Sequence, residues 1–199
     1  MAENKSRDKI IEETFKLLLK YPADKITVPI LEEATGLTRG SLFYYFEDKE
    51  DLFRETMKYY SLAIRSAQFR VDPKVCGSFR EYIDFSMAKI QKMLDTARAS
   101  GIEHPERTYL AFLFRAVTDY EGFDKIVLTN IENERKEIAG MLSIARERGE
   151  IRQDVDVDMA ARQFRYIYVG MITESAAEKG IDLSSLKKLY LDYYNYLKS

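Results

Sequence analysis

The sequence predicts an all-α fold, in which a small N-terminal helix-turn-helix domain is joined by a connecting helix to a larger helical domain. Three observations predict this fold class. Apolar residues recur at the three- and four-residue spacing of a helix face, and strand-like alternation is hard to find. Only 4 prolines and 9 glycines interrupt the 199 residues. They separate about nine helical stretches, which are short before residue 46 and long after residue 48.

The composition is that of a folded chain. Apolar residues make up 46% and charged residues 32%, with 31 basic against 33 acidic side chains and a formal net charge of -2. Such a chain collapses rather than staying disordered. No apolar run approaches the ~20 residues of a membrane span, and the polar N-terminus lacks a signal-peptide pattern. A single cysteine, Cys76, excludes an intrachain disulfide, so we expect a cytoplasmic protein in a reducing compartment.

Capping residues and glycines set the expected helix boundaries. Two short helices, at about 29–35 and 39–45, precede a long helix that runs from about 48 to 70 and connects the two parts. Thr27 and Thr38 are the residue type that caps a helix N-terminus, and they stand directly before the two short helices.

The stretch from residue 27 to 49, TVPILEEATGLTRGSLFYYFEDK, carries the functional hypothesis. Two short helices joined by a turn that contains glycine match the helix-turn-helix pattern. In that motif the second helix enters the major groove of DNA. On a helical wheel Leu42 and Phe46 face inward, and the opposite side carries polar residues. This stretch is therefore predicted to bind DNA.

Hydroxyl and cationic groups of this stretch are candidates for DNA contacts. Hydroxyls donate to phosphate oxygens, and Arg39 can pair with guanine or with a phosphate. Lys49 adds a positive charge beside a helix N-terminus, and Gly40 lets the backbone approach DNA closely. The predicted DNA-binding residues are Thr27, Thr38, Arg39, Gly40, Ser41, Tyr44, Tyr45 and Lys49.

The same stretch resembles the DNA-binding domain of the TetR family of bacterial transcription regulators. The family pattern G-V-S-x-G-x-L-Y-x-H-F-x-x-K-x-x-L is followed from Gly36 to Leu52, with Phe43 and Tyr45 in place of the usual Tyr and His. The similarity spans about residues 7–55. It implies a DNA-binding domain at residues 1–50 and an effector-binding and dimerisation domain at residues 51–199. It also implies a homodimeric repressor that a small apolar effector releases from a palindromic operator.

Two further sets of residues follow from the resemblance, because the later helices of the family surround an effector pocket and form the dimer interface. Aromatic stripes more often pack in an intrachain core, which remains the alternative for both sets. The predicted pocket residues are Phe85, Tyr109, Phe112, Tyr166 and Met171. The predicted interface residues are Phe164, Tyr168, Leu186, Tyr190, Tyr193 and Tyr194.

Other function classes have less support in the sequence. Metal-ligand, nucleophile and phosphate-loop motifs are missing, and a single histidine, His104, argues against a zinc site or a catalytic triad. We therefore expect no enzyme, no metal and no cofactor. One observation opposes DNA binding, since residues 1–50 hold 8 basic and 10 acidic residues, whereas nucleic-acid binders are usually basic. A helical interaction module that has lost DNA binding is the alternative.

Overall fold

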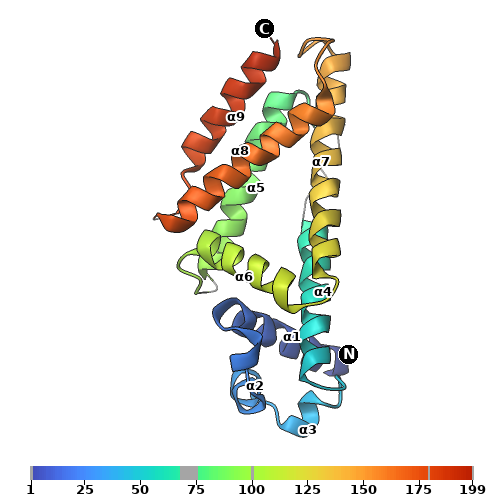
Figure 1. The fold of residues 1–199 in the computed structure, drawn as a ribbon, viewed down its shortest axis with the longest axis vertical. Coiled ribbons are helices and arrows are strands. Elements are labelled where there is room, and N and C mark those ends of the chain that lie inside the picture. Colours follow the sequence, from blue (N-terminus) through green and yellow to red (C-terminus); the bar gives the residue numbers. More distant parts are fainter. Residues whose placement is uncertain (1, 68–75, 100, 179, 199) are drawn as a thin grey trace. The chain divides into compact units, whose positions relative to one another are not determined.

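A computed structural model describes residues 2–67, 76–99, 101–178 and 180–198. Its regular elements are nine α-helices and one 3-10 helix, with no strand in these ranges, which confirms the all-α prediction (Figure 1). No helix in the described ranges is both long and apolar enough to cross a membrane. In chain order the elements are α1 (Ala2–Lys20), the 3-10 helix η1 (Ala23–Lys25), α2 (Val28–Thr35), α3 (Arg39–Leu42), α4 (Lys49–Ala67), α5 (Phe79–Ala99), α6 (Pro105–Asp119), α7 (Phe123–Glu147), α8 (Val157–Ala177) and α9 (Leu183–Lys198).

The chain divides into two compact units. Unit 1 comprises Met1–Gln68 and Ala111–Val127, and unit 2 comprises Phe69–Leu110 and Leu128–Ser199. This division differs from the boundary expected at residue 50, because α4 and parts of α6 and α7 belong to the N-terminal unit. The reason is packing, since their apolar side chains are buried in the same core as α1. The DNA-binding and effector-binding roles of the two parts remain predictions.

The core of unit 1 forms where the apolar faces of its helices meet. Side chains from α1 to α4 fill it, including Leu42, which is fully buried. Phe112 completes it from α6, with its ring centroid 5.4 Å from that of Phe15 and 6.3 Å from that of Phe123. Arg115 of the same helix donates through Nη2 to the carbonyl groups of two residues in the last turn of α1, Leu18 and Leu19.

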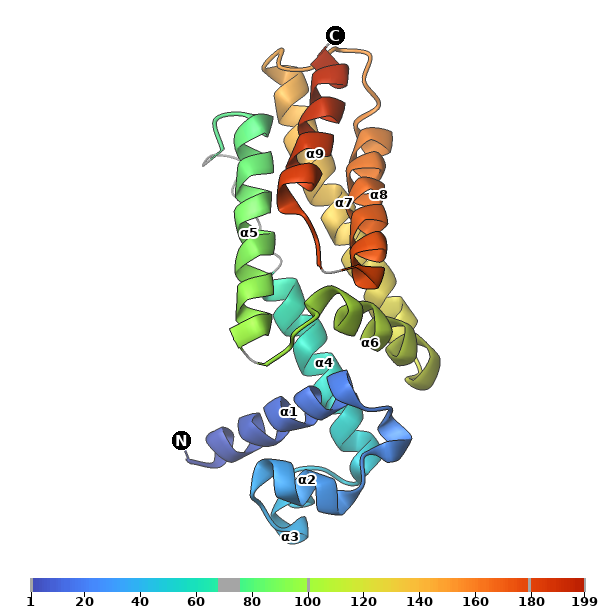
Figure 2. The same cartoon turned by 90° about the vertical axis from the view of Figure 1, so that its left-hand side faces the viewer.

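The core of unit 2 joins α5, α7, α8 and α9. Figure 2 shows α9 between α5 and α8, consistent with the contacts that α9 makes with both. Phe79 and Phe164 are each 1% exposed, and their ring centroids are 5.1 Å apart. Two side chains cap the start of α5: the Glu81 amide donates to Ser78 Oγ at 3.2 Å, and the Gly77 amide donates to the Glu81 carboxylate at 2.8 Å.

One expected helix boundary needs correction, and another lies outside the described residues. The second short helix, expected at 39–45, ends at Leu42. Beyond it the Tyr45 amide donates to the carbonyl group of Leu42, three residues back, so the chain tightens into turns before α4. The connecting helix begins at Lys49 and is described to Ala67, so its expected end near residue 70 lies outside the described residues.

Replacing Phe164 by alanine removes the aromatic ring from the centre of unit 2. We expect Phe164→Ala to lower the free energy of unfolding by about 3–5 kcal/mol, because a buried cavity adds to the lost transfer free energy. Urea unfolding followed by circular dichroism measures this change. The control is Phe85→Ala, which removes an aromatic ring that is 40% exposed on α5 of the same unit. Equal destabilisation by the two variants would contradict the assignment of Phe164 to the core.

Candidate nucleic-acid interface

The turn between α2 and α3 is held by local hydrogen bonds. Thr35 is buried, and its hydroxyl donates to the carbonyl group of Leu31 at 2.7 Å and accepts from the Leu37 amide at 3.2 Å. Gly36 ends α2 with a φ of +67°, the left-handed conformation that favours glycine. Its amide donates to the carbonyl group of Glu32 at 2.8 Å. Hydrogen bonds of Thr35 and Gly36 therefore stabilise the turn that the sequence predicted from one glycine.

Helix α3 is only four residues long and begins with two side-chain acceptors. Thr38 caps it as predicted, since its Oγ1 accepts from the Ser41 amide at 3.3 Å. The Arg39 amide donates to a carboxylate oxygen of Glu32, on α2, at 2.6 Å. Leu42 anchors the helix in the core of unit 1. The rest of the helix and the turn after it are left largely at the surface.

A shallow surface hollow of about 390 Å³ lies over α3. The structure brings five of the eight predicted DNA-binding residues to it, and Tyr44 is 70% exposed. Leu37 and Ser6 also line it, and sequence reasoning missed both. Nothing in the local pattern ties Ser6, in the first helix, to a motif thirty residues later. The full lining is Ser6, Leu37, Thr38, Gly40, Ser41, Tyr44 and Tyr45.

The other three predicted DNA-binding residues lie outside the hollow. Arg39 is exposed, and its guanidinium carbon is 5.8 Å from the ring centroid of Phe43. Lys49 is half-buried, with Nζ 5.5 Å from the ring centroid of Phe53. Thr27 is exposed and occupies the N-cap position of α2, as predicted, but its side chain makes no capping hydrogen bond. The roles of all eight residues in DNA binding remain predictions.

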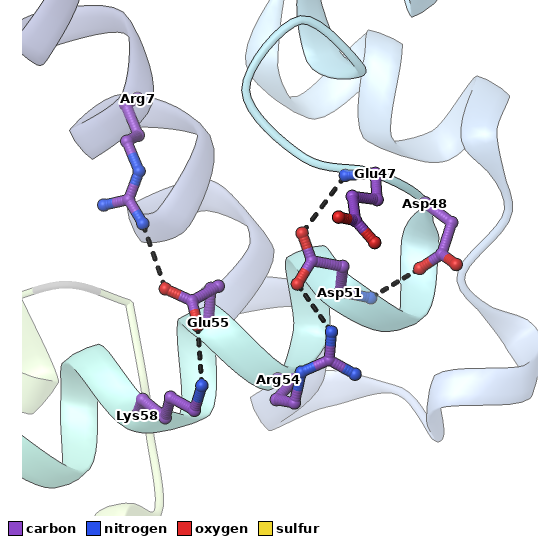
Figure 3. A network of polar contacts seen from close by, with 7 residues as sticks. All are labelled: Arg7, Glu47, Asp48, Asp51, Arg54, Glu55 and Lys58. Carbon is purple, nitrogen blue, oxygen red and sulfur yellow. Dashed lines mark hydrogen bonds and ion pairs between the residues drawn. The ribbon is translucent and has the colours of Figure 1, made fainter.

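The start of α4, which carries Lys49, is held by acidic side chains (Figure 3). The Asp48 carboxylate accepts from the Asp51 amide at 2.6 Å, and the Asp51 carboxylate accepts from the Glu47 amide at 3.1 Å. Figure 3 also shows Glu55 of α4 bonded to Arg7 of α1, at 3.2 Å. Asp48, Asp51 and Glu55 thus serve helix caps and an ion pair within unit 1.

The predicted effector-pocket residues are divided between the two units. Phe112 is buried in the core of unit 1. The other four belong to unit 2, where Met171 packs against the core and Phe85, Tyr109 and Tyr166 are 40–62% exposed. Aromatic character alone did not distinguish a core side chain from a surface one. The binding of an effector by these residues remains a prediction.

Unit 2 contains a cluster of polar side chains that sequence reasoning missed. Arg165 of α8 donates through Nη1 to the Glu134 carboxylate of α7 at 2.8 Å. Burial raises the pKa of Glu134, while Arg165 and Lys89 oppose this rise. Burial also raises the pKa values of the Tyr168 and Tyr190 hydroxyls, and the charge of Glu134 raises them further. These groups come from α5, α7, α8 and α9, and they lie within electrostatic reach of one another.

The predicted interface residues lie in the core of unit 2, the intrachain alternative that the sequence left open. Phe164, Leu186, Tyr190 and Tyr194 are at most 8% exposed, and Tyr168 and Tyr193 pack against the same core. Apolar periodicity placed them on the inner faces of α8 and α9, and the chain itself covers those faces. Other apolar residues of the two helices are exposed at the surface: Met159, Tyr166, Leu189 and Tyr196.

Residues 10–56 match the family described as bacterial regulatory proteins, tetR family. Over 48 residues the chain is 44% identical to the HTH-type transcriptional repressor AcnR of Corynebacterium glutamicum, a match that covers 24% of this chain and 26% of that repressor. A longer match, 23% identical over 187 residues, covers 89% of this chain and 84% of the HTH-type transcriptional repressor BepR of Brucella suis.

The fold of the whole chain also has solved counterparts. The crystal structure of a TetR-family transcriptional regulator from Cytophaga hutchinsonii superposes with a TM-score of 0.73 at 18% identity. The superposition covers 99% of this chain and 96% of that one. The helix-turn-helix geometry, the sequence match of the N-terminal region and the shared fold point the same way. Residues 10–56 thus match the TetR family of bacterial regulatory proteins, and the whole chain has the fold of TetR-family structures.

Proposed function

We propose that the protein is a sequence-specific DNA-binding transcriptional repressor that acts as a homodimer and is released from its operator by a small molecule. The exposed surface of α3 is the observation that carries this proposal. Its hydroxyl groups and its glycine lie over one hollow, next to a buried anchor at Leu42. Such a surface suits the major groove, where the recognition helix of a helix-turn-helix contacts base edges.

Five of the eight predicted residues have roles that suit their positions. Thr38 and Ser41 offer hydroxyls at the first turn of α3, where phosphate contacts fix the register of the helix. The Gly40 backbone permits a close approach, and the exposed Tyr44 ring extends beyond the helix end. Arg39 is exposed and can pair with guanine or with a phosphate. The acidic surplus of residues 1–50 makes affinity depend on these few groups rather than on bulk charge.

Dimerisation would double a small contact surface. A four-residue recognition helix reads few base pairs, and a two-fold dimer reads two half-sites about one helical turn, ~34 Å, or more apart. The exposed apolar residues of α8 and α9 support an interface on these two helices, in place of the buried set that the sequence suggested. Two of these residues lie seven positions apart on α8 and two lie seven positions apart on α9, so each pair shares one helix face, and contiguous exposed apolar surface marks association sites. The residues are Met159, Tyr166, Leu189 and Tyr196.

The polar cluster of unit 2 supports an effector with hydrogen-bonding groups. Ligand sites are mostly apolar with a few placed polar groups, and Glu134 and Arg165 lie beside the apolar core of this unit. We therefore favour an effector with at least one polar group over the small apolar effector that the resemblance implied. Effector and operator then weaken each other's binding by the same factor, as linkage requires.

Tyr44→Ala tests the DNA surface. We expect this variant to bind at least about tenfold more weakly to a duplex that the wild-type protein selects from a random-sequence pool, because one contact at the groove is lost. Fluorescence anisotropy measures the affinity. The matched control, Tyr21→Ala, removes another exposed tyrosine of unit 1 that does not line the hollow. Equal affinities of Tyr44→Ala and the wild type would favour an interaction module that has lost DNA binding.

The salt dependence of DNA binding tests whether only a few cationic side chains contact phosphates. We expect the slope of log affinity against log salt concentration to be smaller in magnitude than about 9, the value for a protein that contacts ten phosphates. The reason is that acidic residues outnumber basic ones in residues 1–50. Anisotropy titrations at four or more salt concentrations give the slope. A steeper dependence would contradict the assignment of affinity to a few placed groups.

Leu189→Arg tests the proposed dimer surface. The side chain is 43% exposed on α9, so a charge there leaves the fold intact and opposes association with a second copy. We expect the wild type to sediment at twice the 23.2 kDa of one chain and Leu189→Arg to sediment as a monomer. The control is Met93→Arg, on the exposed surface of α5. A Leu189→Arg variant that sediments like the wild type would place the interface elsewhere.

A further inference from the structure

We propose that Glu32 is a positioning residue for DNA recognition, because its carboxylate fixes the N-terminus of the recognition helix α3. This inference rests on the proposed function, that α3 binds DNA. Glu32 itself lies on α2, seven positions before the amide to which it is bonded. It was not among the residues that sequence reasoning selected for DNA contact.

Helix α3 needs such a contact because it is too short to stabilise itself. Isolated helices shorter than ~12–15 residues are marginal in water, and the first N–H groups of any helix lack a partner within it. In α3 two of these groups have side-chain acceptors, Thr38 for the Ser41 amide and Glu32 for the Arg39 amide. The bond to Glu32 is the shorter of the two, at 2.6 Å against 3.3 Å. It also involves a charged acceptor, which makes the stronger type of hydrogen bond.

Glu32 serves both sides of the turn. Its carbonyl group accepts from the Gly36 amide at 2.8 Å, which ends α2. Its carboxylate accepts from the Arg39 amide, which starts α3. The rotation of α2 is set by its buried residues Leu31 and Thr35, so the carboxylate is presented in a fixed direction. One residue thus constrains the angle between the two helices of the motif.

The position of α3 sets where its DNA-facing groups lie. Gly40 and Ser41 follow Arg39 directly and line the hollow together with Thr38. If the N-terminus of α3 shifts or frays, these three residues move relative to the DNA groove. A carboxylate near phosphates also repels DNA, but here it complements the positive end of the helix dipole and has a backbone donor. We therefore assign Glu32 a net favourable effect on DNA binding.

Two substitutions separate the hydrogen bond from the charge. Glu32→Ala removes the acceptor and the charge, whereas Glu32→Gln keeps an amide oxygen that can accept from the Arg39 amide and removes only the charge. We expect Glu32→Ala to bind the selected duplex about tenfold more weakly, the effect of losing an N-terminal cap, and Glu32→Gln to stay within about threefold of the wild type. Glu33→Ala and Glu33→Gln are the matched controls, because Glu33 is an exposed neighbour of the same charge.

A second measurement needs no DNA. Hydrogen exchange of the Arg39 amide in the free protein, followed by NMR, reports the bond directly. We expect faster exchange in Glu32→Ala, and protection close to the wild type in Glu32→Gln and in both Glu33 variants. Unchanged exchange in Glu32→Ala would overturn the proposal. A wild-type protein that prefers no sequence would instead refute the proposed function, while the exchange data would still test the cap.

The affinities distinguish the remaining explanations. Tighter binding by both Glu32 variants than by the wild type would make Glu32 a repulsive charge and overturn the proposal. Wild-type affinity in Glu32→Ala would do the same. Equal losses in both variants, together with a changed base at one position of the selected sequences, would mean that the carboxylate reads a base directly. Only loss in Glu32→Ala with rescue in Glu32→Gln supports the positioning role.

Discussion

The candidate DNA surface depends on the burial of one leucine. Helix α3 has four residues, and Leu42 is the only one of them that is buried. Fully burying a leucine side chain contributes ~1.5–3 kcal/mol, comparable to or larger than the contribution of a cap. The side chain reaches a core built by α1, α2 and α4, so the recognition helix is held by the helices beneath it. Tyr44, two residues further on, is exposed because this anchor fixes the rotation of the segment.

Local chemistry made the helix-turn-helix predictable from the sequence. Gly36 adopts the left-handed conformation that the turn requires, Thr38 caps the next helix, and Leu42 faces inward as its spacing predicted. Thr27 stands at an equivalent place before α2, yet its side chain makes no capping bond. A residue type suited to capping permits a cap, but the geometry of the approaching chain decides whether the bond forms.

Tertiary partners decided what the sequence left open. The apolar stripes of α8 and α9 have the same pattern whether a second subunit or the chain itself covers them, and Phe164 and Tyr190 pack within the chain. Glu134 and Arg165 are 31 positions apart, so no short-range sequence pattern predicts their ion pair. Glu32 was not predicted to be a functional residue for a related reason, since an acidic residue on a predicted helix usually faces solvent. Its partner is a backbone amide, which composition and periodicity do not reveal.

The division of the chain has a consequence for its modularity. Unit 1 is discontinuous in sequence, because Ala111–Val127 completes a core that the first 68 residues leave open. A fragment cut after the helix-turn-helix would expose the apolar surface on which Phe112, Ala116 and Phe123 rest. Residues 1–68 therefore do not form an independent domain. Exchanging the N-terminal unit between relatives requires that residues 111–127 be exchanged together with it.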